Sequence, residues 1–296
     1  MANEQTPFSQ LFAPVPEGFL TPFWYGSLQS CWLYYRIEPH VLRGRLPDLP
    51  NGDRLEVALF DFGGGQLAGL ASLDLQRYTG QASQFLETAN EVEFNFYVYP
   101  ETRLPAVPLM SWQQYLLGVD QTKTIGGYRL HVPCDNPNAV AAGKGLYGEP
   151  KYLAVFDCTV PSLNAPPSNR WTYQVYQDAG KPGTPVRGAL IYGLEYDLTG
   201  APSVPGSPSP LIEYGVVAPG GVQRVVANYW EFYGPFDTYL DLPGLATITL
   251  GTEPDKTGTI DDLKLLIGGS QPIAAQVYTS PPVSVESRGW FPVRIS

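Results

Sequence analysis

The sequence is poor in residue types that carry much of enzyme and metal chemistry. Among 296 residues there are 3 cysteines and 2 histidines, and charged residues make up only 16%. Cys31, Cys134 and Cys158 form no Cys-x-x-Cys pair, which argues against a disulfide framework or zinc site and predicts three small buried hydrophobic side chains. His40 and His131 have no metal-ligating neighbour at suitable spacing, so we expect no metal and a structural role for both.

Patterns for phosphate and nucleotide binding are also missing. There is no Gly-x-x-x-x-Gly-Lys-Ser/Thr loop and no Gly-x-Gly-x-x-Gly turn, so we expect no cofactor. A Gly-x-Ser-x-Gly elbow is absent, although two histidines still allow a Ser-His-Asp triad. The formal charge of −10 at pH 7, with no run of basic residues, argues against nucleic acid as a partner.

Long apolar runs are absent as well. No stretch approaches the roughly 18 residues that a membrane helix needs, and the first 19 residues lack the basic and apolar regions of a signal peptide. We therefore expect a cytoplasmic protein that does not interact with membranes.

What the sequence does have is turn formers and apolar residues, with 31 glycines, 30 prolines and 44% hydrophobic residues. This composition argues against a helical bundle and predicts a large core. Runs typical of strands lie at 31–37, 54–61, 91–99, 153–160, 172–176, 190–196, 222–232, 247–250 and 274–278. The prediction is one mainly β domain over residues 1–296, in which the Pro/Ser-rich stretch 199–210 is a surface loop.

Four short helices are predicted from capping signals. Residues 39–45 open with a proline at an allowed position, 111–117 start with serine, and 137–145 follow Asp-Asn and end in glycine. Residues 259–267 run from a threonine into a Gly-Gly stop. The fold class is therefore mainly β with a few short helices.

Lysine is scarce, and one of the six lysines has an unusual setting. Lys151 lies between Pro150 and the apolar run Tyr152-Leu-Ala-Val-Phe156. Burial at that position would lower its pKa from about 10.4 toward the range where the neutral amine is a nucleophile. A lysine that begins a strand is also commonly an exposed surface residue, and the residues alone leave both interpretations open.

A resemblance to a known family starts at these residues. The segment from His131 to Ala154, with Asp135-Asn136 and Gly148-Glu-Pro-Lys151, resembles the active-site segment of acetoacetate decarboxylases. Tyr35-Arg-Ile-Glu-Pro-His with Leu46-Pro47 is similar to an upstream block of that family. The resemblance implies a conical or double β-barrel, a homo-oligomer and a Schiff-base lysine at position 151.

The same resemblance suggests further site residues. It places Glu56 and Glu91 in the active site as proton carriers, with Glu93 possible instead of Glu91 because it faces the same side of the strand. A carboxyl in an apolar interior would have a raised pKa suited to proton transfer.

The chain also departs from the family pattern. The second lysine of the family is Tyr152 here, and the family arginine falls on Leu28 beside Gln29, so the cation expected near the substrate is missing. We expect Tyr152, Tyr147 and Gln29 to contact the substrate. These departures mark a divergent member, weaken the expectation of acetoacetate itself as the substrate and leave the exact substrate open.

The implied activity is that of a lyase acting through Lys151 on a small oxo acid or ketone. Decarboxylation of a β-keto acid is the first expectation. Aldol addition, retro-aldol cleavage or dehydration of a 2-oxo acid such as pyruvate uses the same lysine and is the alternative. A third interpretation is a non-catalytic β-barrel binding protein.

Overall fold

The computed structural model describes residues 12–81, 87–162, 168–181, 184–242, 244, 246–280 and 284–292. The helices are α1 (Pro39–Arg43), η2 (Glu101–Ala106), α2 (Trp112–Leu116), α3 (Pro137–Ala142), η3 (Gly143–Tyr147), η4 (Pro219–Gly221) and α4 (Thr259–Leu266). The strands are β1 (Phe23–Ile37), β2 (Leu55–Val57), β3 (Phe60–Asp61), β4 (Leu67–Gln81), β5 (Glu87–Pro100), β6 (Gly126–Cys134), β7 (Lys151–Thr159), β8 (Arg170–Asp178), β9 (Arg187–Asp197), β10 (Val204–Gly206), β11 (Leu211–Val217), β12 (Arg224–Phe232), β13 (Phe236–Tyr239), β14 (Thr247–Leu250), β15 (Ala274–Ser280) and β16 (Ser284–Glu286).

Seven strands close into a ring. β1 pairs with β4, β4 with β5, β5 with β6, β6 with β11, β11 with β12, β12 with β16, and β16 returns to β1. Only the β6–β11 contact within this ring is parallel. The ring corresponds to the barrel that the resemblance implies, and the predicted mainly β fold with a few short helices is confirmed.

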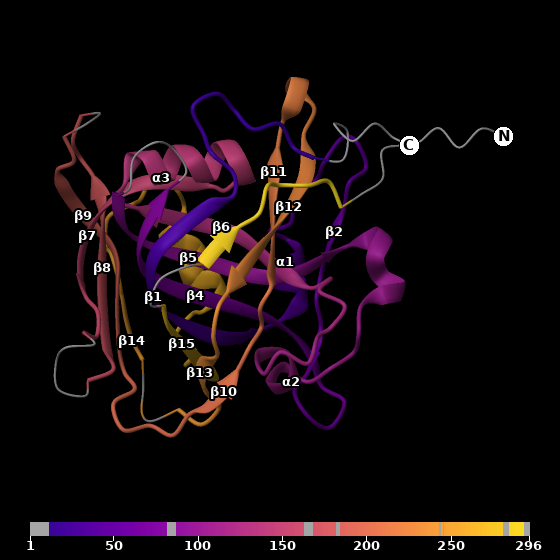
Figure 1. Ribbon diagram of the computed structural model, residues 1–296. Coiled ribbons are helices and arrows are strands. Elements are labelled where there is room, and N and C mark those ends of the chain that lie inside the picture. Colours follow the sequence, from indigo (N-terminus) through magenta and orange to yellow (C-terminus); the bar gives the residue numbers. More distant parts are fainter. Residues whose placement is uncertain are drawn as a thin grey trace.

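Two groups of strands extend from the ring. β7 pairs in parallel with β6 and leads through β8 and β9 to β14, which together form the wall at the left of Figure 1. β15 pairs with β1 on the edge that also carries β16, opposite β4. It leads to β13 and β10. The stretch 199–210, predicted as a surface loop, therefore contains one short strand, β10, which pairs with β13.

The core has two parts that lie on opposite faces of β1. Trp32 and Tyr34 face the inside of the ring, where Trp32 packs against Trp230 of β12 and Tyr34 against Tyr97 of β5. Neither β12 nor β5 is hydrogen-bonded to β1, so these contacts cross the ring. Leu33 and its neighbours on the other face join a second cluster with residues of β8, β9 and α4. Both faces of β1 are thus buried.

All four predicted helices are confirmed at nearly the predicted bounds. Ser111 accepts a hydrogen bond from the backbone N–H of Gln114 at 3.2 Å, and the Gln114 side chain accepts one from the N–H of Ser111 at 2.9 Å. This reciprocal cap explains where α2 begins. None of the helices in the described residues is long and apolar enough to span a membrane.

The strand predictions were less complete. β4, β6, β10, β11, β13 and β16 were not predicted. β1 starts at Phe23 rather than residue 31, and the run 54–61 divides into β2 and β3. The three cysteines are free. Cys31 and Cys134 are buried as predicted, whereas Cys158 is partly exposed.

Candidate active site

Lys151 is the first residue of β7, and local signals fold the segment before it. The Asn136 side chain accepts a hydrogen bond from the backbone N–H of Ala139 at 2.9 Å, which caps α3. The chain continues through the wider turn η3 and leaves the helix at Gly148, whose φ of 68° favours glycine. β7 then starts beside β6, with Lys151 opposite Val132.

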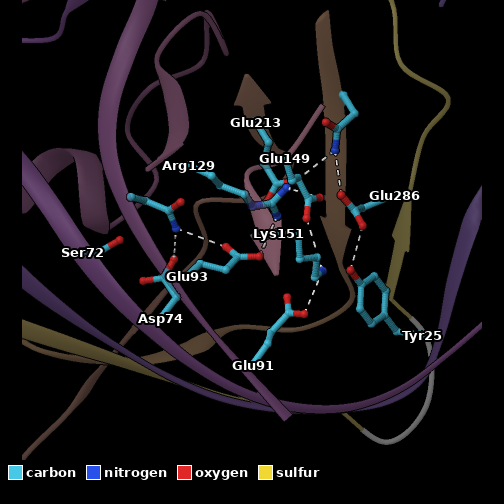
Figure 2. Close-up of polar contacts among 12 residues, drawn as sticks. Tyr25, Ser72, Asp74, Glu91, Glu93, Arg129, Glu149, Lys151, Glu213 and Glu286 are labelled. Atoms are coloured by element: carbon cyan, nitrogen blue, oxygen red, sulfur yellow. Dashed lines mark hydrogen bonds and ion pairs between the residues drawn. The ribbon is translucent and has the colours of Figure 1, made fainter. Parts of the chain in front are cut away.

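The Lys151 amine lies between two carboxylates inside the ring (Figure 2). Its Nζ is 2.8 Å from Glu91 Oε2 and 3.2 Å from Glu149 Oε2, and the lysine side chain is only 6% exposed. Gly143 makes this approach possible, because a Cβ there would lie 2.3 Å from Glu149 Oε2 and 2.7 Å from Lys151 Cδ. A larger residue at 143 would displace both side chains.

The pKa of Lys151 reflects two opposing effects. Burial lowers it, but the charges of Glu149 and Glu91 raise it more, and the pKa lies well above its ordinary value. The expectation that burial alone would leave a neutral amine is therefore wrong for the protein without substrate. The two carboxylates, one of them two residues upstream on the same turn, reverse the direction of the shift.

Arg129 of β6 is the second buried cation. Its Nη1 lies 2.6 Å from Glu149 Oε1, its Nη2 lies 2.8 Å from Glu93 Oε1, and Nη2 also contacts Glu213 Oε1. Burial alone would raise the pKa of Glu149, but Arg129 and Lys151 lower it below its ordinary value. Glu149 therefore links the two cations as an ionised carboxylate.

A buried amide joins two acids on one side of Arg129. Asn95 Nδ2 donates to Asp74 Oδ2 at 2.7 Å and to Glu93 Oε2 at 3.1 Å. Burial and then the charge of Glu93 raise the pKa of Asp74 well above its ordinary value. Burial also raises the pKa of Glu93, although Arg129 opposes it. Burial therefore favours the protonated form of this pair.

A similar pair lies on the other side of Arg129. Asn228 Nδ2 donates to Glu213 Oε2 at 2.9 Å and to Glu286 Oε1 at 2.8 Å. Tyr25 donates its hydroxyl to Glu286 Oε2 at 2.7 Å. Burial raises the pKa of Glu213 well above its ordinary value and raises that of Glu286 as well. Burial therefore favours the protonated form of the second pair as well.

Two buried tyrosines lie near the acids of the cluster. Tyr78 donates its hydroxyl to Glu91 Oε2 at 2.8 Å, the same oxygen that contacts Lys151. The Tyr147 hydroxyl is buried and has no hydrogen-bond partner among the residues that the structure describes. Burial raises the pKa of both phenols well above the ordinary value, so both stay protonated and can donate a hydrogen bond.

The site thus places a buried ammonium at hydrogen-bond distance from a carboxylate that can accept its proton. The six carboxyl groups around the two cations provide both ionised and protonated acids (Figure 2). In the described part of the chain, no group of three or more His, Cys, Asp or Glu side chains is arranged to hold a metal ion.

Comparison with solved structures identifies the fold that carries this site. No family model matches the sequence, and no curated protein matches it. Among solved structures, acetoacetate decarboxylase from Legionella pneumophila aligns with 99% of this chain and 98% of its own at a TM-score of 0.57 and 12% identity. An acetoacetate decarboxylase-like enzyme from Sphingomonas wittichii aligns with 100% of this chain and 99% of its own, at a TM-score of 0.57 and 13% identity.

The chain has the acetoacetate decarboxylase-like fold. A third structure with this fold is the enduracididine biosynthesis enzyme MppR, complexed with the condensation product of pyruvate and imidazole 4-carboxaldehyde. It aligns with 95% of this chain and 90% of its own at a TM-score of 0.54 and 15% identity. The resemblance found in the sequence motifs is therefore confirmed at the level of the fold.

Within the acetoacetate decarboxylase-like fold, the predicted residues fall into two groups. Glu91 contacts Lys151, and its alternative Glu93 lies in the same cluster on Arg129. The buried Tyr147 belongs to the surroundings of Glu149, on the turn that precedes the lysine.

The other three predicted residues lie elsewhere. Glu56 is half-buried in β2 opposite Tyr99 of β5, eight residues along the strand from Glu91, which is more than about 20 Å of extended chain. Tyr152 follows Lys151 on the opposite face of β7, and its hydroxyl lies 2.8 Å from Thr259 Oγ1. Gln29 donates from Nε2 to the Pro161 carbonyl at 2.8 Å. No contact in the described residues joins these three to Lys151.

Sequence reasoning missed most of the charged residues of the cluster. The missed residues are Asp74, Arg129, Glu149, Glu213 and Glu286. Each except Glu149 lies inside a strand, and all four of those strands, β4, β6, β11 and β16, were not predicted. The signal that could have identified these residues is a single charged residue within an otherwise apolar stretch of sequence. Leu28 is buried among apolar side chains, and a cation in the cluster around Lys151 is instead Arg129 of β6.

Proposed function

We propose that this chain is an enzyme that forms a Schiff base between Lys151 and a small oxo acid or ketone and then cleaves or forms a carbon–carbon bond. The observation that carries the proposal is the buried Lys151 amine 2.8 Å from Glu91 Oε2. A buried nucleophile with an acceptor for its proton is what imine formation needs. The fold shared with acetoacetate decarboxylase supports the same interpretation.

The first step is the attack of the amine. Because Glu149 and Glu91 hold the pKa of Lys151 high, one proton must pass from Nζ to a carboxylate as the carbonyl approaches, and Glu91 is the nearer acceptor. The nitrogen lone pair then bonds to the carbonyl carbon. The carbinolamine loses water and becomes a protonated imine.

Decarboxylation of a β-keto acid is the first candidate reaction. The bond to the substrate carboxylate breaks, CO₂ leaves, and the electron pair moves to the imine nitrogen to give an enamine. A proton from a carboxyl group such as Glu91 is added to the enamine carbon. Addition of water then releases the ketone and restores the amine.

Aldol chemistry or dehydration of a 2-oxo acid is the second candidate, and one observation favours it. In this reaction an enamine from pyruvate, formed by loss of a proton, adds to an aldehyde carbon. The structure of MppR with a condensation product of pyruvate has the same fold.

The test is chemical trapping of the imine. The protein is incubated with pyruvate or acetoacetate, reduced with borohydride and weighed by mass spectrometry, beside Lys151→Ala and the control Lys144→Ala on η3. We expect one adduct in the wild type and in the control and none in Lys151→Ala. No adduct with either compound, or an adduct that persists in Lys151→Ala, would support the binding-protein alternative and refute the proposal.

A second measurement divides the two reactions. Release of CO₂ from acetoacetate at a rate above the uncatalysed one supports decarboxylation. Formation of a condensation product from pyruvate and an aldehyde supports the second candidate. Tyr147→Phe is expected to weaken trapping in either case, because the buried hydroxyl is the donor without a partner.

A further inference from the structure

A cavity with no role in the reaction proposed above lies next to the lysine cluster, and Tyr78 is one of its lining residues. Its volume is about 210 Å³, and its walls come from β1, β4, β5 and α3. Most of its lining is apolar and includes Phe19, Phe23, Tyr78, Ala89 and Ala139. A volume below the roughly 300 Å³ of pockets for drug-sized molecules suits a substituent of a few carbon atoms.

Tyr78 connects this cavity to Lys151. The Tyr78 ring lines the cavity and packs edge-on against Phe23, with ring centroids 6.3 Å apart. Its hydroxyl is 2.8 Å from Glu91 Oε2, and the same oxygen is 2.8 Å from Lys151 Nζ. The phenol oxygen is therefore at most twice that distance from the amine. The cavity wall and the nucleophile are separated by one carboxylate.

The charges around the cavity are negative. Glu17 and Glu87 line it, and no lysine or arginine lies among the lining residues that the structure describes. Glu87 is held in place by two amides, since Asn136 Nδ2 donates to its Oε2 at 2.6 Å and Asn138 Nδ2 donates to its Oε1 at 2.8 Å. A second carboxylate on a substrate would meet this fixed negative charge without a cation to pair with it.

Resting on the Schiff-base function proposed above, we propose that this cavity binds the apolar, uncharged substituent of the carbonyl substrate, so that the enzyme selects ketones whose carbonyl carbon carries a short hydrocarbon chain. The apolar wall removes that chain from water, and Tyr78 lies where the cavity approaches the Glu91 oxygen that contacts the amine. Oxo acids with a carboxylate at the far end of the same chain are excluded.

The experiment compares three ketones in borohydride trapping at Lys151: acetone, 2-heptanone and 6-oxoheptanoate, which has the same carbon chain as 2-heptanone with a terminal carboxylate. Burial of two or more extra methylenes is expected to lower the half-saturating concentration of 2-heptanone at least about 10-fold relative to acetone. The value for 6-oxoheptanoate is expected to lie at least about 10-fold above that of 2-heptanone.

Two variants place this preference in the cavity. Ala139→Leu fills it from α3, and Ala141→Phe fills its exposed mouth. Both are expected to remove the preference for 2-heptanone while acetone still labels Lys151. The matched control is Ala246→Leu, which enlarges an alanine in a separate groove between β14 and α4 and should leave the preference unchanged.

The outcomes separate the two proposals. If acetone labels Lys151 but 2-heptanone is not preferred, or the preference survives in both filled variants, the cavity assignment is wrong while the Schiff-base function stands. Equal trapping of 6-oxoheptanoate and 2-heptanone overturns the exclusion of charged chains. If no ketone labels Lys151, the function fails and the cavity assignment fails with it.

Discussion

The stability of the protein should fall as pH rises from about 5 to 7, because four buried carboxyl groups have raised pKa values. Asp74, Glu93, Glu213 and Glu286 all have raised pKa values in the folded state because burial disfavours their charged forms. A carboxyl with a raised pKa contributes stability that is complete below its unfolded pKa and is lost as pH rises toward the folded value. The pH range over which this stability is lost therefore begins just above the ordinary pKa values of 3.8 for Asp and 4.5 for Glu.

The size of the effect follows from the number of retained protons. Each proton that the folded state keeps and the unfolded state has lost reduces the free energy of unfolding by about 1.4 kcal/mol per pH unit. With one proton kept by each of the two amide-bridged pairs, the expected slope is about 2.7 kcal/mol per pH unit. Total stabilities are about 5 to 15 kcal/mol, so the change is large enough to measure.

Two other groups act outside this window. Glu149 has a lowered pKa, so its contribution is present above its ordinary value of 4.5 and is lost only as pH falls through the lowered value. Lys151 has a raised pKa, and its contribution is lost only as pH rises above 10.5. The stability maximum should therefore lie near pH 5.

The assay is urea unfolding, followed by tryptophan fluorescence at several pH values between 5 and 8 and constant ionic strength. Asp74→Asn mimics the protonated acid, because Asp74 Oδ1 has no described partner and leaves room for an amide. It should reduce the slope by about 1.4 kcal/mol per pH unit. The exposed Asp157→Asn is the control. A stability that stays constant or rises from pH 5 to 7 would refute the assignment of buried protons.

Three further changes test the cluster. Arg129→Leu leaves three buried carboxylates without their cation and should cost about 3 to 5 kcal/mol in urea unfolding; a loss below 1 kcal/mol would contradict this. Gly143→Ala should slow borohydride trapping at Lys151 at least about 10-fold, whereas Gly145→Ala, where a Cβ meets only side-chain atoms at 3.3 Å or more, should not. Glu149→Gln removes the largest effect that raises the pKa of Lys151, so the pH midpoint of trapping should move to lower pH; an unchanged midpoint would show that Glu91 alone sets it.

The helices were predictable because their signals are local. Ser111 with Gln114 and Asn136 with Pro137 are caps that act within four residues, so the sequence contains the complete interaction. The strands of the ring were harder to predict. Nearly every described side chain of β4 from Ala68 to Gly80 is buried, and a strand with two buried faces loses the alternation that marks a strand.

The site was predictable only where it follows the family motif. Lys151 and Glu91 lie in segments whose spacing resembles that family, and the structure brings them to 2.8 Å. Arg129 and Glu213 meet because β6 and β11 pair in parallel, although the two residues are 84 positions apart. No local pattern encodes such a pairing. The sign of the Lys151 shift depends on Glu149, whose orientation is set by Gly143 and Arg129.

The closed ring has a consequence for how the protein is made. The strand pair that closes it is β1 with β16, which places Phe23 opposite Glu286. Glu286 belongs to the buried acid pair beside Arg129. During synthesis the ribosome must release the chain through Glu286 before this strand pair can form. Until then the charges of the cluster face solvent and the nascent chain has two open strand edges. Folding dominated by such distant contacts is slow, so the cluster around Lys151 should be completed as one of the final events of folding.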